Sequence, residues 1–285
     1  MNKLLLALVL PPFLSLATGC DADTTGEEAD GDDAVGEAEG FFVVENSLIP
    51  NSLIPNSLIP NSLIPNALSP TALGPGALAA LQAPTADGAA ARQLIKYTVS
   101  CAFTEAQSFA FTWTDSSGQV HAEVYWGDLG IAPGWADNPL DGDLDQRLVS
   151  ACLAARVNWY GTSVVISARS TKKPFKKKVD SFELTTYPHI EGAFWGNLFA
   201  PQPYLHACHE PANVAISRAA SRDCAAGHLD ESGQPVPCGI IALAGPCSDW
   251  CVSSTLPGGT YRHCVDRPGV PTSPSTTAVI TTALP

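Results

Sequence analysis

The sequence contains no apolar run long enough to cross a membrane as a helix. Its leading run, Leu4 to Leu16, is broken by two prolines and falls short of the roughly 20 residues that a span requires. Three catalytic or phosphate-binding patterns are also absent: the Gly-x-Ser-x-Gly elbow, the His-Glu-x-x-His zinc motif and the glycine-rich phosphate loop. The chain therefore carries no recognised hydrolase signature.

Positive charge is scarce, and the negative charge is concentrated near the N-terminus. Lysine and arginine number 15 against 28 aspartates and glutamates, for a net charge of −13. Residues 21–45 hold ten acids and no base, whereas the chain from Arg92 onward holds 17 acids and 14 bases. The folded part is thus close to neutral, and no nucleic-acid partner is expected.

The apolar leader predicts export and a lipid anchor. Residues 1–19 have the positive start and apolar core of a signal peptide. The stretch Leu16-Ala-Thr-Gly-Cys20 resembles the lipobox of bacterial lipoproteins, although Ala17 stands where leucine is usual. We therefore predict that Cys20 is acylated and anchors the protein in a bacterial membrane, with the outer membrane or cell surface favoured over the inner membrane. The alternative is an ordinary signal peptide with a chance cysteine.

Two low-complexity segments follow the leader. Residues 20–45 are acidic and poor in apolar side chains, which predicts a lipidated, disordered tether. Residues 46–91 begin with four copies of Asn-Ser-Leu-Ile-Pro and continue through decayed copies into a linker. Proline in each unit excludes a continuous helix or a central strand. Two structures of the repeat are possible. It is either a semi-rigid spacer, or its Leu/Ile pairs dock on the folded domain, on another envelope protein or on each other. We favour partial docking.

The rest of the chain predicts an α+β fold, with helices packed on an antiparallel sheet and a loop-rich, disulfide-rich C-terminal extension. We assign residues 92–200 to the α+β domain, 201–267 to the cysteine-rich extension and 268–285 to a disordered tail. The tail is assigned from its Pro, Thr and Ser content.

Periodicity of the apolar residues places the elements within this region. Helices are predicted at residues 89–102, capped by Asp87, and at 144–158, capped by Gly142 or Asp143 and stopped by Gly161. Alternation predicts two hairpins, which pair residues 108–113 with 120–126 and residues 162–170 with 179–187.

Cysteine usage indicates an oxidising compartment. Nine cysteines are present, and removing Cys20 leaves an even set. Cys101 and Cys152 lie on the two predicted helices and are expected to form a disulfide. The full set of disulfide candidates is Cys101, Cys152, Cys208, Cys224, Cys238, Cys247, Cys251 and Cys264.

Four thiols in the extension raise the alternative of a zinc site. A zinc ribbon uses two Cys-x2-Cys knuckles, whereas this stretch has a single Cys-x3-Cys. We therefore expect disulfides there, with no metal and no cofactor. The four residues are Cys224, Cys238, Cys247 and Cys251.

The strongest chemical cluster is His206-Ala-Cys208-His209-Glu210, with Glu191 upstream. A metal site is disfavoured because His206 and His209 would face opposite sides of a strand. The enzyme alternative is an exported hydrolase or glycan-acting enzyme that uses Glu191 with His206 or His209. Further acids would come from Asp143 and Asp145.

Two other stretches have both an ordinary and a functional interpretation. The lysine-rich turn is expected to be solvated, and its alternative role is an anion contact with lipid head groups or an envelope polyanion. Its lysines are Lys172, Lys173, Lys176, Lys177 and Lys178. The aromatic residues Phe194, Trp195 and Phe199 are expected in the core, with carbohydrate stacking as the alternative.

Several motifs carry a resemblance to a known group of proteins. They are the Asn-x-Leu-x-Pro repeat, Leu94-Ile-Lys-Tyr-Thr-Val-Ser-Cys101, Val149-Ser-Ala-Cys152, Asn158-Trp-Tyr-Gly161, Glu191-Gly-Ala-Phe-Trp-Gly-Asn-Leu-Phe199 and the terminal cysteines. On these motifs the chain resembles a group of secreted lipoproteins of myxobacterial type that share the repeat and a cysteine-rich C-terminal domain. The resemblance covers roughly residues 46–265 and implies an exported surface protein, but it transfers no catalytic residue.

The leading hypothesis is a lipid-anchored cell-envelope protein that displays a disulfide-stabilised domain for adhesion or recognition, without catalysis. Its partner would be an envelope glycan or polyanion.

Overall fold

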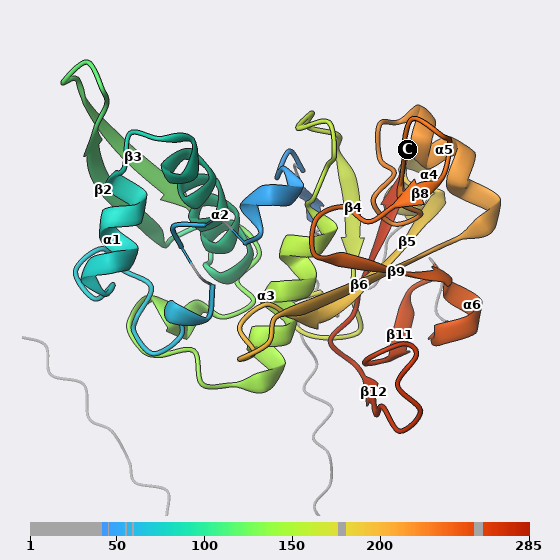
Figure 1. Cartoon of the computed structure of the whole chain (residues 1–285). Coiled ribbons are helices and arrows are strands. Elements are labelled where there is room, and N and C mark those ends of the chain that lie inside the picture. Colours follow the sequence, from blue (N-terminus) through green and yellow to red (C-terminus); the bar gives the residue numbers. More distant parts are fainter. Residues whose placement is uncertain (1–41, 45, 55, 59, 176–180, 254–258) are drawn as a thin grey trace, which may run out of the picture. The chain divides into compact units, whose positions relative to one another are not determined.

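The computed structural model describes residues 42–44, 46–54, 56–58, 60–175, 181–253 and 259–285 (Figure 1). The signal peptide, Cys20 and nearly all of the acidic tether lie outside these residues, as do Lys176, Lys177 and Lys178. Residues 40–285 form one compact unit. Within the described ranges, no helix is long and apolar enough to span a membrane.

A six-stranded mixed sheet organises this unit and confirms the predicted α+β class. All neighbouring strands are antiparallel except the last pair, which is parallel. Because β5 and β6 pair along their length, the predicted domain boundary at residue 200 divides one continuous sheet. In spatial order the strands are β1 (Phe42–Val44), β4 (Ile166–Arg169), β13 (Ile280–Leu284), β5 (His189–Asn197), β6 (Tyr204–His209) and β9 (Ile241–Pro246).

The two faces of this sheet carry separate cores. On the first face, which we call the helical face, Phe194, Leu205 and Ile280 pack in the large core together with helix α3 (Asp143–Ala155). On the opposite face, which we call the disulfide face, Ala193 and Trp195 pack with cystine sulfurs in a smaller core. The alternation of side chains along β5 separates the two sets.

The repeat is part of the large core, so docking rather than a free spacer is confirmed. Its leucines recur every five residues, and each is at most 7% exposed. They are Leu48, Leu53, Leu58, Leu63, Leu68 and Leu73. Short 3-10 turns at Pro50–Ser52 and Pro60–Ser62 bend the chain between these side chains. The proline pentad thus works as a series of turns that present one leucine at a time to the core.

Neighbouring elements supply the hydrogen bonds that the proline-rich chain cannot make with itself. Leu68 N donates to Trp135 O at 2.7 Å, and Asn158 N donates to Leu48 O at 2.9 Å. Gln93 of helix α2 (Ala86–Ala102) donates to Ser47 O at 3.0 Å and accepts from the Ser52 hydroxyl at 2.6 Å. The repeat is therefore fixed by backbone contacts as well as by leucine burial.

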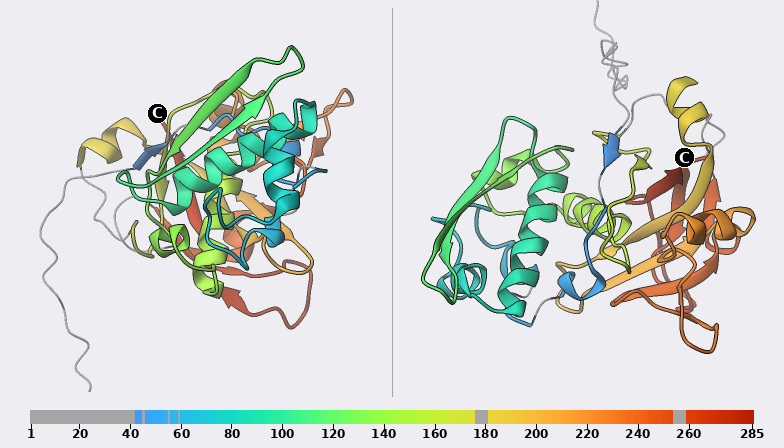
Figure 2. Two further views of the ribbon diagram at one scale, coloured as in Figure 1. Left: turned by 90° about the vertical axis from the view of Figure 1, so that its left-hand side faces the viewer. Right: turned by 90° about the horizontal axis from the view of Figure 1, so that it is seen from above.

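The predicted helices and the first hairpin are confirmed, with corrected ends. Helix α2 is capped by Thr85, whose hydroxyl accepts from Gly88 N, and not by Asp87. Helix α3 begins after Gly142 but ends at Ala155, three residues before the predicted end. Helix α1 (Pro75–Gln82) packs beside α2, and β2 (Ser108–Thr114) pairs with β3 (Val120–Trp126) (Figures 1 and 2). The predicted Cys101–Cys152 disulfide joins α2 to α3.

The second predicted hairpin is wrong. Only Ile166–Arg169 of the first predicted strand is extended, and residues 181–186 of the second form helix α4 (Ser181–Thr186). Strand β4 pairs instead with β1 and β13, which come from the two ends of the described chain. Glu183 of α4 forms a buried ion pair with Arg169 at 2.8 Å, which holds the helix against β4.

The predicted disordered tail is also wrong, because β13 lies between β4 and β5 in the sheet. All five residues of β13 are buried, and the two threonines find partners for their hydroxyls. Thr282 donates to Glu191 at 2.8 Å, and Thr281 accepts from Tyr261 N at 2.8 Å. The threonine-rich composition of the tail suggested exposure to solvent. Threonine nevertheless forms strands well, and here its hydroxyl groups have hydrogen-bond partners.

The C-terminal region adds two small sheets, β10-β11-β12 and β7-β8, and short helices beside the central sheet, and all eight disulfide candidates are paired. The disulfides are Cys101–Cys152, Cys208–Cys247, Cys224–Cys238 and Cys251–Cys264. The remaining elements are α5 (Val214–Ala219), α6 (Cys247–Trp250), β7 (His228–Leu229), β8 (Pro235–Val236), β10 (Cys251–Ser253), β11 (Tyr261–Val265), β12 (Ser275–Thr276) and 3-10 turns at Pro133–Ala136 and Pro211–Asn213.

Candidate functional sites

Glu191 does not form an open site with His206 or His209. The pairing of β5 with β13 skips Glu191, a bulge that turns its side chain to the helical face. Its Oε2 accepts from Arg222 Nη2 at 2.8 Å and from the Thr282 hydroxyl at 2.8 Å. Both side chains of the Glu191–Arg222 pair are fully buried. Glu191 is therefore closed off in an ion pair, which removes the residue on which the enzyme alternative depended.

The two histidines of β6 lie on opposite faces of the sheet, as the strand alternation predicted. His206 is opposite Trp195 on the disulfide face, with ring centroids 5.7 Å apart. Burial lowers the pKa of both His206 and His209. Cys208 between them is bonded to Cys247, so no thiol is available for a metal at this cluster.

The structure also tests part of the predictions for the aromatic stretch, the four cysteines and the lysine-rich turn. Phe194, Trp195 and Phe199 are buried in the two cores, which confirms the core interpretation over a stacking platform. The four thiols proposed as a zinc alternative do not converge, because they belong to three different disulfides. Lys172 and Lys173 are described and follow β4, but the other three lysines of the turn are outside the described residues.

A polar cleft of about 500 Å³ opens where α3, the start of β6 and the segment after β11 meet. At its centre Arg147 Nη1 donates to Asp266 Oδ1 at 2.7 Å and to the Tyr204 hydroxyl at 2.8 Å, while Arg147 Nε donates to Asp143 at 2.7 Å. The Tyr204 hydroxyl donates to Asp266 Oδ2 at 2.8 Å. The guanidinium of Arg267 lies 4.1 Å above the Tyr204 ring.

Two groups of this network, Arg147 and Tyr204, have raised pKa values. Burial opposes the charge of Arg147, but the hydrogen bond to Asp143 and the charge of Asp266 outweigh it, so the pKa of Arg147 is raised. Burial, together with the hydrogen bond to Asp266, raises the pKa of Tyr204 and keeps its hydroxyl protonated. The cleft thus combines balanced charges with an aromatic ring and the amides of Gln146 and Asn197.

The repeat contributes one wall of this cleft. Asn61, Ile64 and Pro65 line it beside Phe199. The position of Ile64 is fixed by its carbonyl, which accepts from Leu140 N at 3.0 Å. Sequence reasoning could not place this cleft, because its residues come from four distant segments.

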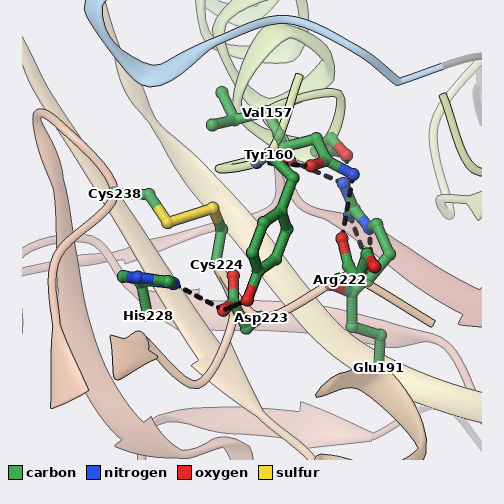
Figure 3. Close-up of a disulfide and its surroundings, with 11 residues drawn as sticks. Val157, Tyr160, Glu191, Arg222, Asp223, Cys224, His228 and Cys238 are labelled. Atoms are coloured by element: carbon green, nitrogen blue, oxygen red, sulfur yellow. Dashed lines mark hydrogen bonds and ion pairs between the residues drawn. A yellow bond between two sulfur atoms is a disulfide. The ribbon is translucent and has the colours of Figure 1, made fainter. Parts of the chain in front are cut away.

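A second cluster surrounds Asp223 near the Cys224–Cys238 disulfide (Figure 3). Asp223 Oδ2 accepts from the Tyr160 hydroxyl at 3.1 Å and lies 2.8 Å from His228 Nδ1. Trp159 stacks on the His228 ring with centroids 4.1 Å apart. Burial and the Asp223 charge raise the pKa of Tyr160, so its hydroxyl stays a donor. Asp223 therefore orients the imidazole, and the stacked indole fixes its plane.

Several buried polar atoms close to this cluster have no hydrogen-bond partner among the described residues. They are Glu191 Oε1, Ser217 Oγ, Arg218 Nε and Asp223 Oδ1. Ser221, in the same segment, has a φ of 55°, a left-handed conformation uncommon for serine. Unsatisfied groups and backbone strain gather at functional sites more often than elsewhere. The segment from Ser217 to Asp223 is therefore a second candidate site, which the sequence did not indicate.

One group of three metal-ligating residues occurs in the described ranges. Atoms of Asp223, Cys224 and Cys238 lie within 4.8 Å of one another. With the two sulfurs joined as a disulfide, only the carboxylate is free to ligate.

Comparison with protein-family models, with curated proteins and with solved structures gave no match.

Proposed function

We propose that this protein is a lipid-anchored, exported cell-envelope protein whose folded unit recognises an envelope glycan in the cleft around Arg147. Four disulfides support an extracellular location, because such bonds persist in oxidising compartments. The leader and Cys20 supply the proposed route and anchor.

The observation that carries the proposal is the donor and acceptor arrangement of the cleft. Sugar hydroxyls both donate and accept hydrogen bonds, and sugar rings offer apolar faces. Asp143 is a carboxylate acceptor with 72% of its side chain exposed, and Arg267 supplies exposed donors above an aromatic ring. Arg147, Tyr204 and Asp266 already satisfy one another, so they provide a rigid floor and need no rearrangement on binding.

The balanced charge of the cleft favours a glycan over a simple polyanion. Two arginines in it face two aspartates, so the site has little net attraction for phosphate or sulfate. A polyanion would have to use the lysine turn instead, and such binding would weaken steeply with added salt.

The test is binding of the full-length chain, purified in detergent, to soluble peptidoglycan fragments and to lipopolysaccharide-derived polysaccharide. We expect Arg267→Ala and Asp143→Asn each to weaken binding at least tenfold. Arg262→Ala is the matched control, since this arginine is exposed on β11 but does not line the cleft, and it should change affinity less than twofold.

Failure of both glycan classes to bind, or equal binding by wild type and the two cleft variants, would reject glycan recognition at this site. Loss of binding on Lys172→Gln/Lys173→Gln with strong salt dependence would instead assign the contact to the lysine turn. The anchor is tested separately by palmitate labelling, which Cys20→Ala should abolish while releasing the protein from membranes.

A further inference from the structure

We propose that Asp223, Cys224, His228 and Cys238 form a zinc site when the two cysteines are reduced, so that this locus holds either a disulfide or a metal ion. The inference is independent of the proposed glycan recognition, because it concerns a different cluster.

Three of the four donor atoms lie close enough together for one ion, and the fourth lies beside the carboxylate. A carboxylate oxygen of Asp223 and the sulfurs of Cys224 and Cys238 lie within 4.8 Å of one another. His228 is outside that group, but its Nδ1 is 2.8 Å from Asp223 Oδ2, so the imidazole has to shift toward the sulfurs to complete a tetrahedral site. Two thiolates, an imidazole and a carboxylate are all ligands that zinc accepts.

A buried oxygen without a partner points to a ligand at this place. Asp223 is 3% exposed, and its Oδ1 has no hydrogen bond among the described residues. A carboxylate oxygen buried in this way is costly unless a cation or donor reaches it. The Cys224–Cys238 disulfide beside it offers neither charge nor a hydrogen, so the oxidised form leaves this oxygen unexplained.

The surroundings of the cluster are those of a supported metal site. Tyr160 donates to Asp223 (Figure 3). Trp159 stacks on the His228 ring, so two ligands are oriented by neighbours before any metal arrives. His228 is 19% exposed, which gives an ion a path from solvent. The contact between His228 Nδ1 and Asp223 Oδ2 would give way to the metal.

The chemistry balances as a two-electron exchange. A dithiol or phosphine reductant supplies two electrons, the S–S bond breaks, and each sulfur takes a proton to become a thiol. The dithiol is converted to its disulfide, or the phosphine to its oxide with an oxygen atom from water. Zinc then displaces the two thiol protons, which pass to solvent, and binds Nδ1 of the neutral imidazole, whose proton is carried on Nε2. Dioxygen takes two electrons from the two thiolates and is reduced to hydrogen peroxide, which reforms the disulfide and releases the ion.

The experiment follows which cysteines stay reduced when zinc is present. The full-length chain is reduced with a phosphine, freed of it, and re-oxidised in air with one equivalent of zinc or with a chelator. Free thiols are then alkylated and located by peptide mass spectrometry. With zinc, we expect Cys224 and Cys238 to be alkylated while the other three disulfides reform; with chelator, all four should reform.

Substitutions distinguish zinc binding at this site from zinc binding by an unfolded chain. Asp223→Asn should raise the zinc concentration for half-protection by about tenfold or more, as expected on losing one ligand. His228→Ala should act in the same direction. Asp230→Asn is the matched control, because its carboxylate serves only the β7–β8 turn, where it accepts from Ser232 and Gln234. Each oxidised variant is first checked for the Cys224–Cys238 bond.

Cobalt provides a second readout. Reduced wild type should give the thiolate-to-cobalt absorption of a tetrahedral site with two sulfur ligands, and Cys224→Ser/Cys238→Ser should not. Re-oxidation of Cys224 and Cys238 at the same rate with zinc as with chelator would overturn the proposal. So would protection that is spread over other cysteines and is unchanged by Asp223→Asn.

Discussion

The two faces of the central sheet are held in different ways. On the helical face, a large core joins α3, α2 and the repeat leucines to the sheet. On the disulfide face, the core is small, Cys208–Cys247 joins β6 to α6, and Cys251–Cys264 joins β10 to β11. Two of the four disulfides belong to each core, so covalent bonds are a larger share of what stabilises the disulfide face, where the covering chain has less apolar surface.

Breaking the fully buried Glu191–Arg222 ion pair of the helical face should have the largest effect. Glu191→Leu leaves the Arg222 guanidinium buried without its carboxylate, and we expect a loss of about 3–5 kcal/mol in the free energy of unfolding. Chemical denaturation measures it. The double variant Glu191→Leu/Arg222→Met should recover most of the loss, and a double variant as unstable as the single one would contradict this account.

Removing a disulfide tests how strongly covalent bonds stabilise the disulfide face. Cys208→Ala/Cys247→Ala opens a loop with a sequence separation of 39, and chain entropy predicts a loss of about 4 kcal/mol. Cys251→Ala/Cys264→Ala, with a separation of 13, should cost about 3 kcal/mol. Thermal unfolding of both variants under identical conditions gives the comparison. The reverse ranking would show that strain or packing, rather than loop entropy, sets the contribution of these bonds.

Truncating one repeat leucine should lower the free energy of unfolding by less than Glu191→Leu or Cys208→Ala/Cys247→Ala does. Leu63 is fully buried, so Leu63→Ala leaves a cavity, and we expect a loss of about 3 kcal/mol that is independent of added reductant. Ile54, which is 38% exposed in the preceding units, is the matched control, and Ile54→Ala should change stability by less than about 0.5 kcal/mol. Equal effects of the two variants would mean that the repeat does not pack in this register.

The smallest effect is expected in the β2–β3 hairpin, where a single carboxylate orders the turn. Hydrogen bonds from His121, Ser117 and the Gln119 amide lower the pKa of Asp115. Because the folded pKa is depressed, this contribution is present above the ordinary aspartate pKa of about 3.9 and is lost as pH falls through the folded value. Amide chemical shifts of Ser117 and Gln119 should follow this titration. In Asp115→Asn the pH dependence should vanish.

The sequence predicted the elements whose signals are local. Helix α2, helix α3 and the first hairpin were found because periodicity, capping and a four-residue turn all lie within a short stretch. The pairing of Cys101 with Cys152 was predicted because each cysteine lies on one of two helices that face each other. Partial docking of the repeat was favoured because a free spacer would leave a Leu/Ile pair exposed in every unit; in the structure the leucines dock, whereas Ile49 and Ile54 stay exposed.

The sequence predictions failed where the structure depends on contacts between distant segments. The Pro and Thr content around strand β13 suggested a solvent-exposed tail. Only the position of the strand between β4 and β5 buries its threonines and brings them to their hydrogen-bond partners. Asp223 and Arg147 each have one local partner, His228 and Asp143, but their other partners come from distant segments. Tyr160 reaches Asp223, and Tyr204 and Asp266 reach Arg147, through the fold alone, and the sequence did not indicate these contacts.

The pentad repeat has an ambiguity that ordinary core segments lack. Sliding it by five residues puts leucine where leucine was, so the identical units cannot tell one alignment from the next. The alignment must be set by partners outside the repeat: Val164, which bonds the Asn46 side chain at the start, and Trp135, whose indole donates to the Asn66 carbonyl at 3.1 Å at the end. A gene that gained or lost one unit would therefore still place a leucine at every fifth position and yet fail to reach both of these fixed points.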